Sequence, residues 1–238
     1  MKQSIPPVPS INCDLGESWA LQRSGEQRKI LSLCDLANIA CGAHAGDREL
    51  TRQSIEETVE AGVRAGAHPG YPDPEHFGRR PLFRNPYTTA DISALVAEQV
   101  AFAQDCAQSC GSSLYHVKVH GALYNEAAAD GEVAEAIAFG VRQVCRDVFL
   151  VGLAQSVMVN VFRRQGFTTL REAFADRRYT PKGLLVPRTD PRAQIEDPAE
   201  ALAQIGKLAR FADTVCVHSD SPNALAILRA LRGLDTIE

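Results

Sequence analysis

The sequence predicts an α/β fold, a single domain built as a parallel, seven-stranded (β/α) barrel. Seven short apolar runs alternate with longer amphipathic stretches, which is typical of a parallel sheet with helical crossovers. The 238 residues contain no linker rich in Gly, Ser or Pro, so we expect one domain over residues 1–238. An unbroken series of seven units favours a closed barrel over its alternative, an open doubly wound sheet.

The elements follow from their periodicity. The predicted strands cover residues 10–13, 36–40, 63–67, 115–119, 148–152, 170–174 and 214–218. The clearest predicted helices cover residues 48–63, 89–111, 131–146 and 197–212. Asp47 or Thr51 is expected to cap the first helix and Thr89 the second, because their side-chain oxygens can accept the free N–H groups of a first turn. Gly62 and Gly111 are expected where helices stop.

Composition excludes several classes of function. Hydrophobic residues make up 45% and charged residues 23%, and the net charge of -4 gives no general attraction for nucleic acid or a membrane surface. No apolar run approaches the roughly 18 residues that span a bilayer. The N-terminus lacks the apolar segment of a secretory signal, and seven cysteines without framework spacing suggest reduced thiols. We therefore expect a cytoplasmic protein.

The segment 116–120 is unusual for a buried strand because it carries titratable side chains. Side chains alternate along a strand, so His116, Lys118 and His120 share one face, and the intervening valines share the other. In a barrel the valine face packs under helices and the other face points inward. Since an unpaired buried charge costs several kcal/mol, Lys118 needs carboxylates, a metal or a ligand nearby.

Polar residues also follow the other predicted strands. The carboxyl ends of parallel strands converge on one face, where active sites are built. Five residues hold such positions: Asp14, His44, His68, His120 and His218. Each alone has an ordinary structural explanation, but the joint pattern predicts one shared site. The sequence has no phosphate-binding G-x-x-x-x-G-K-[ST] loop and no G-x-G-x-x-G fingerprint.

Several blocks, in chain order, carry a specific resemblance. They are "NCDLGE", "ANIACGAHAGD", "GAHPGYPD", "FGRR", "HVKVHGALYN", "FADRRY" and "CVHSD". Over nearly the whole chain the sequence resembles the LamB/YcsF family, described as the A subunit of the bacterial ATP-dependent 5-oxoprolinase. The resemblance implies a distorted (β/α) barrel akin to glycoside hydrolases and polysaccharide deacetylases. It also implies cleavage of 5-oxo-L-proline to L-glutamate, coupled to ATP hydrolysis, together with two partners, the B and C subunits.

This reaction suggests roles for the polar residues. ATP is expected to bind mainly to the partners, because the chain has no nucleotide loop. The expected catalytic residues are Asp14, His44, Lys118 and His120, with the general base left open among Asp14, His44 and His120. The expected substrate-binding residues are Asn12, His68, Arg79, Tyr124, Asn125, Arg178 and His218.

Two alternatives remain at this point. A metal-dependent amide hydrolase or carbohydrate deacetylase would hold a divalent ion on Asp14, His44 and His120, since one Asp and two His at strand ends can bind such an ion. A non-catalytic member of the complex would only bind a lactam or a partner.

Overall fold

The computed structural model describes residues 9–234 and confirms the seven-stranded barrel. The strands are β1 (Ser10–Leu15), β2 (Leu36–Ala40), β3 (Arg64–His68), β4 (His116–Val117), β5 (Phe149–Leu153), β6 (Thr169–Phe174) and β7 (Thr214–His218). All neighbours are parallel, and pairing of β1 with β7 closes the sheet. The open doubly wound sheet is therefore wrong for this chain.

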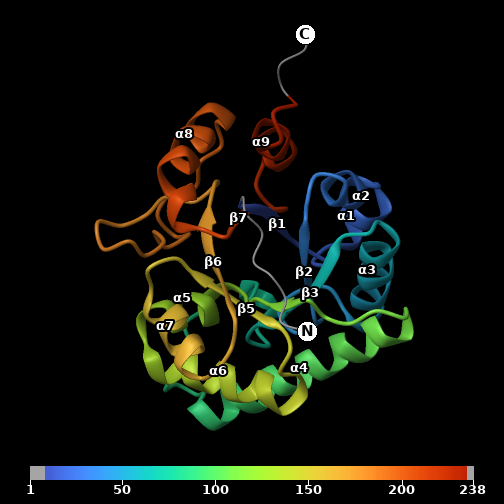
Figure 1. The fold of residues 1–238 in the computed structure, drawn as a ribbon, viewed down its shortest axis with the longest axis vertical. Coiled ribbons are helices and arrows are strands. Elements are labelled where there is room, and N and C mark those ends of the chain that lie inside the picture. The colour runs from blue at the N-terminus through green and yellow to red at the C-terminus, as the bar shows by residue number, and fades with distance from the viewer. Residues whose placement is uncertain (1–8, 235–238) are drawn as a thin grey trace.

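Helices surround the strands (Figure 1). They are α1 (Trp19–Arg23), α2 (Glu26–Leu31), α3 (Arg48–Glu60), α4 (Thr89–Ser109), α5 (Gly121–Ala129), α6 (Gly131–Val144), α7 (Val157–Arg164), α8 (Pro198–Leu208) and α9 (Ala224–Leu231), with the 3₁₀ turns η1 (Pro74–His76) and η2 (Ala209–Phe211). The long helices α4 and α6 pack side by side along the barrel. Among residues 9–234, no helix combines the length and the apolar character that crossing a membrane requires.

The predicted caps are confirmed at one helix and shifted at the other. Asp47 accepts hydrogen bonds from the backbone N–H groups of Glu49 and Leu50 at the start of α3. At α4 the cap is Thr88 rather than the predicted Thr89. Thr88 and Asp91 form a reciprocal capping box in which each side chain binds the other's backbone N–H, and this places the cap one residue earlier than predicted.

The barrel interior has two layers of different character. At the amino-terminal ends of the strands, a small apolar cluster fills it, consisting of Leu36, Phe149, Val151 and Leu170. Toward the carboxyl ends the inward positions become polar, as strand periodicity predicts for Asn12, Asp14 and Lys118. The opposite faces of the strands join the larger apolar core beneath the helices.

One glycine makes room for this polar layer. A Cβ at Gly66 would lie 2.2 Å from His116 Nε2, so no larger residue fits while His116 fills the barrel. The His116 ring is fully buried, and its Nε2 donates a hydrogen bond to Asn38 Oδ1 at 2.6 Å. Burial, followed by the nearby Lys118, lowers the pKa of His116 to about 3. His116 is therefore a neutral residue of the barrel interior.

Strand β4 is shorter than predicted. The ladder ends at Val117, although Lys118 N–H still donates to Ala67 O and His120 N–H to Pro69 O. The chain turns directly into α5, for which His120 is the N-cap residue. His120 therefore leaves the strand and lies at the barrel mouth.

Candidate active site at the barrel mouth

A cavity of about 700 Å³ opens at the carboxyl ends of the strands. Its floor is formed by inward side chains of β1, β3, β6 and β7 and by Lys118, which directly follows β4. The long loops that follow β3 and β6 contribute its walls, which include Arg79, Arg177 and Arg188. The first residues of α5, among them Tyr124 and Asn125, form another side.

The ion pair at the floor is centred on Lys118, which is 2% exposed. Its Nζ lies 3.0 Å from Asp14 Oδ1 and 3.0 Å from Glu172 Oε1. It also contacts Asn12 Oδ1 at 3.3 Å and Cys216 Sγ at 3.0 Å. Burial alone would lower the pKa of Lys118, but the carboxylates outweigh it and raise that pKa well above its ordinary value. The carboxylates that the sequence required are therefore present.

Asp14 is the most connected carboxylate of the floor. Its Oδ1 accepts hydrogen bonds from Lys118 and, at 2.7 Å, from Asn38 Nδ2. Its Oδ2 lies 3.4 Å from His68 Nε2 and 3.8 Å from His218 Nε2. Burial would raise the pKa of Asp14, yet His68 and Lys118 together hold it well below its ordinary value. Asp14 is thus an anion at neutral pH.

His218 is oriented by a carboxylate that the sequence analysis did not name. Its Nδ1 lies 3.1 and 3.0 Å from the two oxygens of Asp176, which also accepts the His218 backbone N–H. Because a carboxylate only accepts hydrogen bonds, Nδ1 carries the proton of the neutral ring. The bare Nε2 then faces Asp14 and the cavity.

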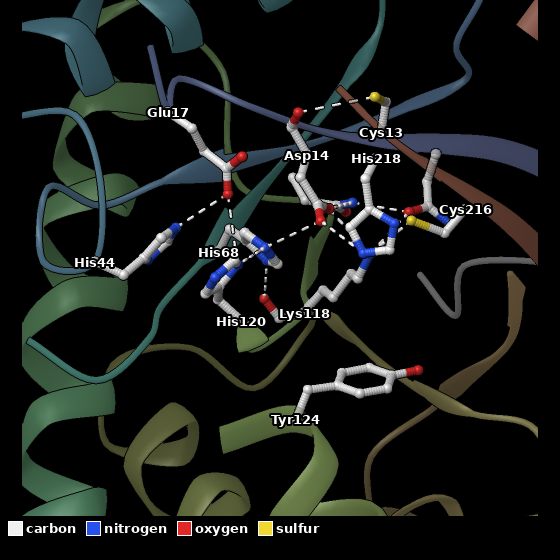
Figure 2. A network of polar contacts seen from close by, with 12 residues as sticks. Cys13, Asp14, Glu17, His44, His68, Lys118, His120, Tyr124, Cys216 and His218 are labelled. Atoms are coloured by element: carbon white, nitrogen blue, oxygen red, sulfur yellow. Dashed lines mark hydrogen bonds and ion pairs between the residues drawn. The ribbon is translucent and has the colours of Figure 1, made fainter. Parts of the chain in front are cut away.

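A second group of histidines lies beside Asp14 (Figure 2). His44, His68 and His120 surround the carboxylate of Glu17, and one donor atom from each of these four residues lies within 4.8 Å of the others. The His44 and His120 rings stack with centroids 3.8 Å apart, and the His68 ring stands perpendicular to that of His120. This donor set is one that can hold a metal ion.

These contacts bring Asp14, His44, His68, His120 and His218 together at the barrel mouth. Five of the seven expected substrate-binding residues line the cavity, namely His68, Arg79, Tyr124, Asn125 and His218. Asn12 lies below Asp14, where its Nδ2 donates to Thr214 Oγ1 and its Oδ1 accepts from Asn38. The Arg178 side chain pairs with Glu200 and does not line the cavity.

The adjacent Arg177 occupies the position expected of Arg178. It is 4% exposed, its Nη2 donates to Val186 O, and its buried Nε has no partner among the described residues. Burial, followed by the charges of Arg188 and Arg79, lowers the pKa of Arg177 to about 10. Asp220 binds both Arg79 and Arg188. The three guanidinium groups form a site suited to an anion.

Several residues of the site were not identified from the sequence, although the sequence carries a signal for most of them. Strand periodicity indicates Glu172, because residues two apart in a strand share a face, and Glu172 lies two residues before Phe174 on the inward face of β6. Glu17, Asp176 and Arg177 lie within the motifs quoted above, directly after strands. Arg188 lies in a loop without periodicity, where the sequence carries no signal for its direction.

Comparison with known proteins identifies relatives that match most of the chain. The LamB/YcsF family model matches residues 10–235. Proteins named as the A subunit of 5-oxoprolinase are similar over most of the chain. The one from Methylococcus capsulatus (strain Bath) is 44% identical, covering 93% of this chain and 90% of its own. The one from Bacillus subtilis (strain 168) is 40% identical, covering 93% and 91%.

A solved structure is also similar. The crystal structure of the lactam utilization protein from Thermus thermophilus superposes with a TM-score of 0.83 at 33% identity, covering 95% of this chain and 96% of that one. The barrel, the site and these matches lead to one conclusion: this chain belongs to the LamB/YcsF family.

Proposed function

We propose that this chain is the A subunit of an ATP-dependent 5-oxoprolinase, which opens the 5-oxo-L-proline lactam to L-glutamate together with the B and C subunits. Relatives with that name match nearly the full chain. The observation that carries the proposal is that one cavity is lined both by three arginines and by the Asp14–His218 pair. A small lactam that bears a carboxylate needs both an anion site and a base.

The general base of this proposal is His218. Asp14 is a weak base because its pKa lies well below its ordinary value. The His44 ring is fully buried and does not line the cavity. His120 Nε2 is bonded to Phe77 O and its Nδ1 faces His68, so neither nitrogen is free for water. His218 lines the cavity and has a bare Nε2, which can take a proton from water.

The remaining residues receive roles from their positions. Water loses a proton to His218 Nε2 as it attacks the ring carbon of the lactam, whose oxygen has been phosphorylated. His218 returns a proton to the ring nitrogen as the C–N bond breaks, and hydrolysis of the acyl phosphate that remains gives glutamate and phosphate. Asp14 stabilises the imidazolium that forms, and the ammonium of Lys118 stabilises negative charge at the phosphorylated oxygen of the substrate. Arg177, with Arg79 and Arg188, holds the substrate carboxylate.

ATP enters through the partners in this proposal. The amide of the closed ring is stable in water, and no catalyst changes an equilibrium, so opening must be coupled to ATP hydrolysis. Phosphorylation of the amide oxygen would make the ring carbon more electrophilic, and the phosphate would leave when the acyl phosphate formed by ring opening is hydrolysed. This chain contains no phosphate-binding loop, so the B and C subunits are assigned the nucleotide and the phosphoryl transfer.

The test is a coupled assay for glutamate and ADP. The chain alone, with or without ATP, is expected to form no glutamate. Addition of the B and C subunits with magnesium and ATP is expected to release glutamate and ADP in equal amounts. Glutamate from this chain and ATP alone would overturn the division of labour, and ADP without glutamate in the full set would assign another substrate.

A second candidate function is favoured by the Glu17 and histidine cluster. A metal-dependent amide hydrolase would bind its ion within this cluster and would need neither ATP nor partners. Amide hydrolysis or deacetylation by the metal-loaded chain alone would support it.

A further inference from the structure

Three atoms that can each accept a hydrogen bond or bind a cation meet beside the cavity. His68 Nε2 lies 3.0 Å from His120 Nδ1, and Glu17 Oε1 lies 3.5 Å from the same His120 atom. The side chains of all three residues are at most 6% exposed, so bulk water does not separate them. Figure 2 shows the Glu17 carboxylate pointing toward the imidazoles.

Backbone carbonyls determine which ring nitrogens are bare. His68 Nδ1 lies 2.7 Å from Lys118 O, and His120 Nε2 lies 2.9 Å from Phe77 O. A carbonyl oxygen only accepts hydrogen bonds, so each of these nitrogens must carry its proton. In the neutral rings the two nitrogens that face each other therefore both present lone pairs, and a cation must lie between them.

A proton serves this geometry less well than a metal ion. One proton can bridge only two acceptors. Two further acceptors also face the space between the imidazoles, namely Glu17 Oε1 and Asp14 Oδ2, and the latter lies 3.4 Å from His68 Nε2. Glu17 has no Lys or Arg partner in the part of the chain that the structure describes.

The spacing of the atoms agrees with coordination. Ligand bonds of about 2.0–2.1 Å around a tetrahedral ion place neighbouring donors about 3.3 Å apart. The observed separations of 3.0 Å between the two nitrogens and 3.5 Å from His120 Nδ1 to Glu17 Oε1 lie on either side of that value. Two imidazoles and one carboxylate form a ligand set that transition metals accept.

His44 has a different role, because its ring is parallel to that of His120 within 3°. A lone pair lies in the plane of its ring, so two stacked parallel rings cannot both point at one ion. His44 Nε2 instead lies 3.1 Å from Glu17 Oε1, where its N–H orients the carboxylate. A contact of this kind typically changes metal affinity by about 10–100-fold.

We propose that the chain binds one divalent transition-metal ion through Glu17 Oε1, His68 Nε2 and His120 Nδ1. His68 and His120 also line the cavity, so the remaining coordination positions face Asp14 and the space where a substrate would bind. The inference concerns the chain's own residues, and it holds whichever substrate the cavity accepts.

The test measures metal binding by the untagged, chelator-treated chain without its partners. Isothermal titration with Zn²⁺ is expected to give one site per chain. Glu17→Gln and His68→Gln should each weaken Zn²⁺ binding at least 100-fold, and His44→Gln should weaken it about 10–100-fold. His76→Gln is the matched control, because His76 lies outside the cluster with a 45% exposed side chain, and its affinity should equal that of the wild type.

Co²⁺ spectra keep the test decisive if a variant fails to fold. The wild-type chain should show visible d–d bands of a nitrogen and oxygen site without the near-ultraviolet thiolate band that its free cysteines would produce. Failure of the wild type to bind Zn²⁺ or Co²⁺ would overturn the proposal and assign the space to a proton. A thiolate band, or binding that Glu17→Gln leaves unchanged, would equally overturn it.

Discussion

Replacement of Asp176 by Asn tests how His218 is prepared as a base. The two Asp176 oxygens receive the His218 backbone N–H at 3.0 Å and the ring Nδ1–H at about 3 Å. An Asn has one oxygen and one NH₂ group. If its oxygen keeps the backbone N–H, its NH₂ faces Nδ1, and the ring proton moves to Nε2. The opposite orientation sets two donors against each other, which costs about 1–3 kcal/mol.

The expected loss follows from this change of tautomer. With a proton on Nε2, the lone pair that faces the cavity disappears. General base catalysis contributes about 10²–10⁴-fold, and the corresponding Asp-to-Asn change in a serine protease triad lowers kcat about 10⁴-fold. We therefore expect Asp176→Asn to lower kcat of the assembled complex by about 10²–10⁴-fold, or about 2.7–5.5 kcal/mol. The free energy of unfolding should fall by only about 1–2 kcal/mol.

Two measurements check this prediction. Glutamate release by the complex with the B and C subunits gives kcat, and nitrogen chemical shifts of the His218 ring in the isolated chain give the tautomer. Asp213→Asn is the control, because Asp213 binds Arg171 outside the cavity and should affect stability without affecting kcat. A folded Asp176→Asn variant with kcat within threefold of the wild type would refute His218 as the base. An unchanged tautomer would refute the orienting role of Asp176.

Two further predictions use neighbouring or matched residues. Arg177→Met should raise KM for 5-oxoproline at least tenfold while Arg178→Met leaves it unchanged, because only the Arg177 side chain lines the cavity. Steady-state kinetics of the complex measure both values of KM, and equal values for the two variants would contradict this prediction. Gly78→Ala should destabilise the chain by at least about 2 kcal/mol in urea unfolding, since its φ of 62° disfavours alanine and the new Cβ would lie 2.8 Å from His44 Cβ. Gly183 also has a positive φ, but a Cβ there would have no neighbour within 4 Å. Gly183→Ala should therefore lower the free energy of unfolding by only about 1 kcal/mol. Equal losses of stability in the two variants would show that the contact with His44 is unimportant.

Local periodicity explains how much of the site could be predicted. Alternation along a strand is set by covalent backbone geometry, so the inward direction of Asp14 and Lys118 required no tertiary information. The convergence of strand ends then grouped His68 and His218 with them. Alternation likewise directs Glu172 of β6 toward the barrel interior, although it does not name its partner.

Only the tertiary structure decided which charged residues pair and where side chains in the loops point. Closure of the barrel sets Lys118 between Asp14 and Glu172, two carboxylates that lie far from it in sequence. Sequence alone could not tell Arg177 from Arg178, because the loop that carries them has no periodic backbone and its direction depends on long-range contacts.

The protonation pattern of the histidines has the same origin. The positions of the histidines at strand ends indicated which residues gather. Which ring nitrogens of His68 and His120 carry a proton is determined by the carbonyls of Lys118 and Phe77, whose positions the sequence does not give. The sequence by itself therefore determined the barrel, its inward faces and the gathering of Asp14 with four histidines at its mouth. The tertiary structure decided which atoms meet there, because hydrogen-bond partners are chosen by distances that only the closed barrel and its packed loops define.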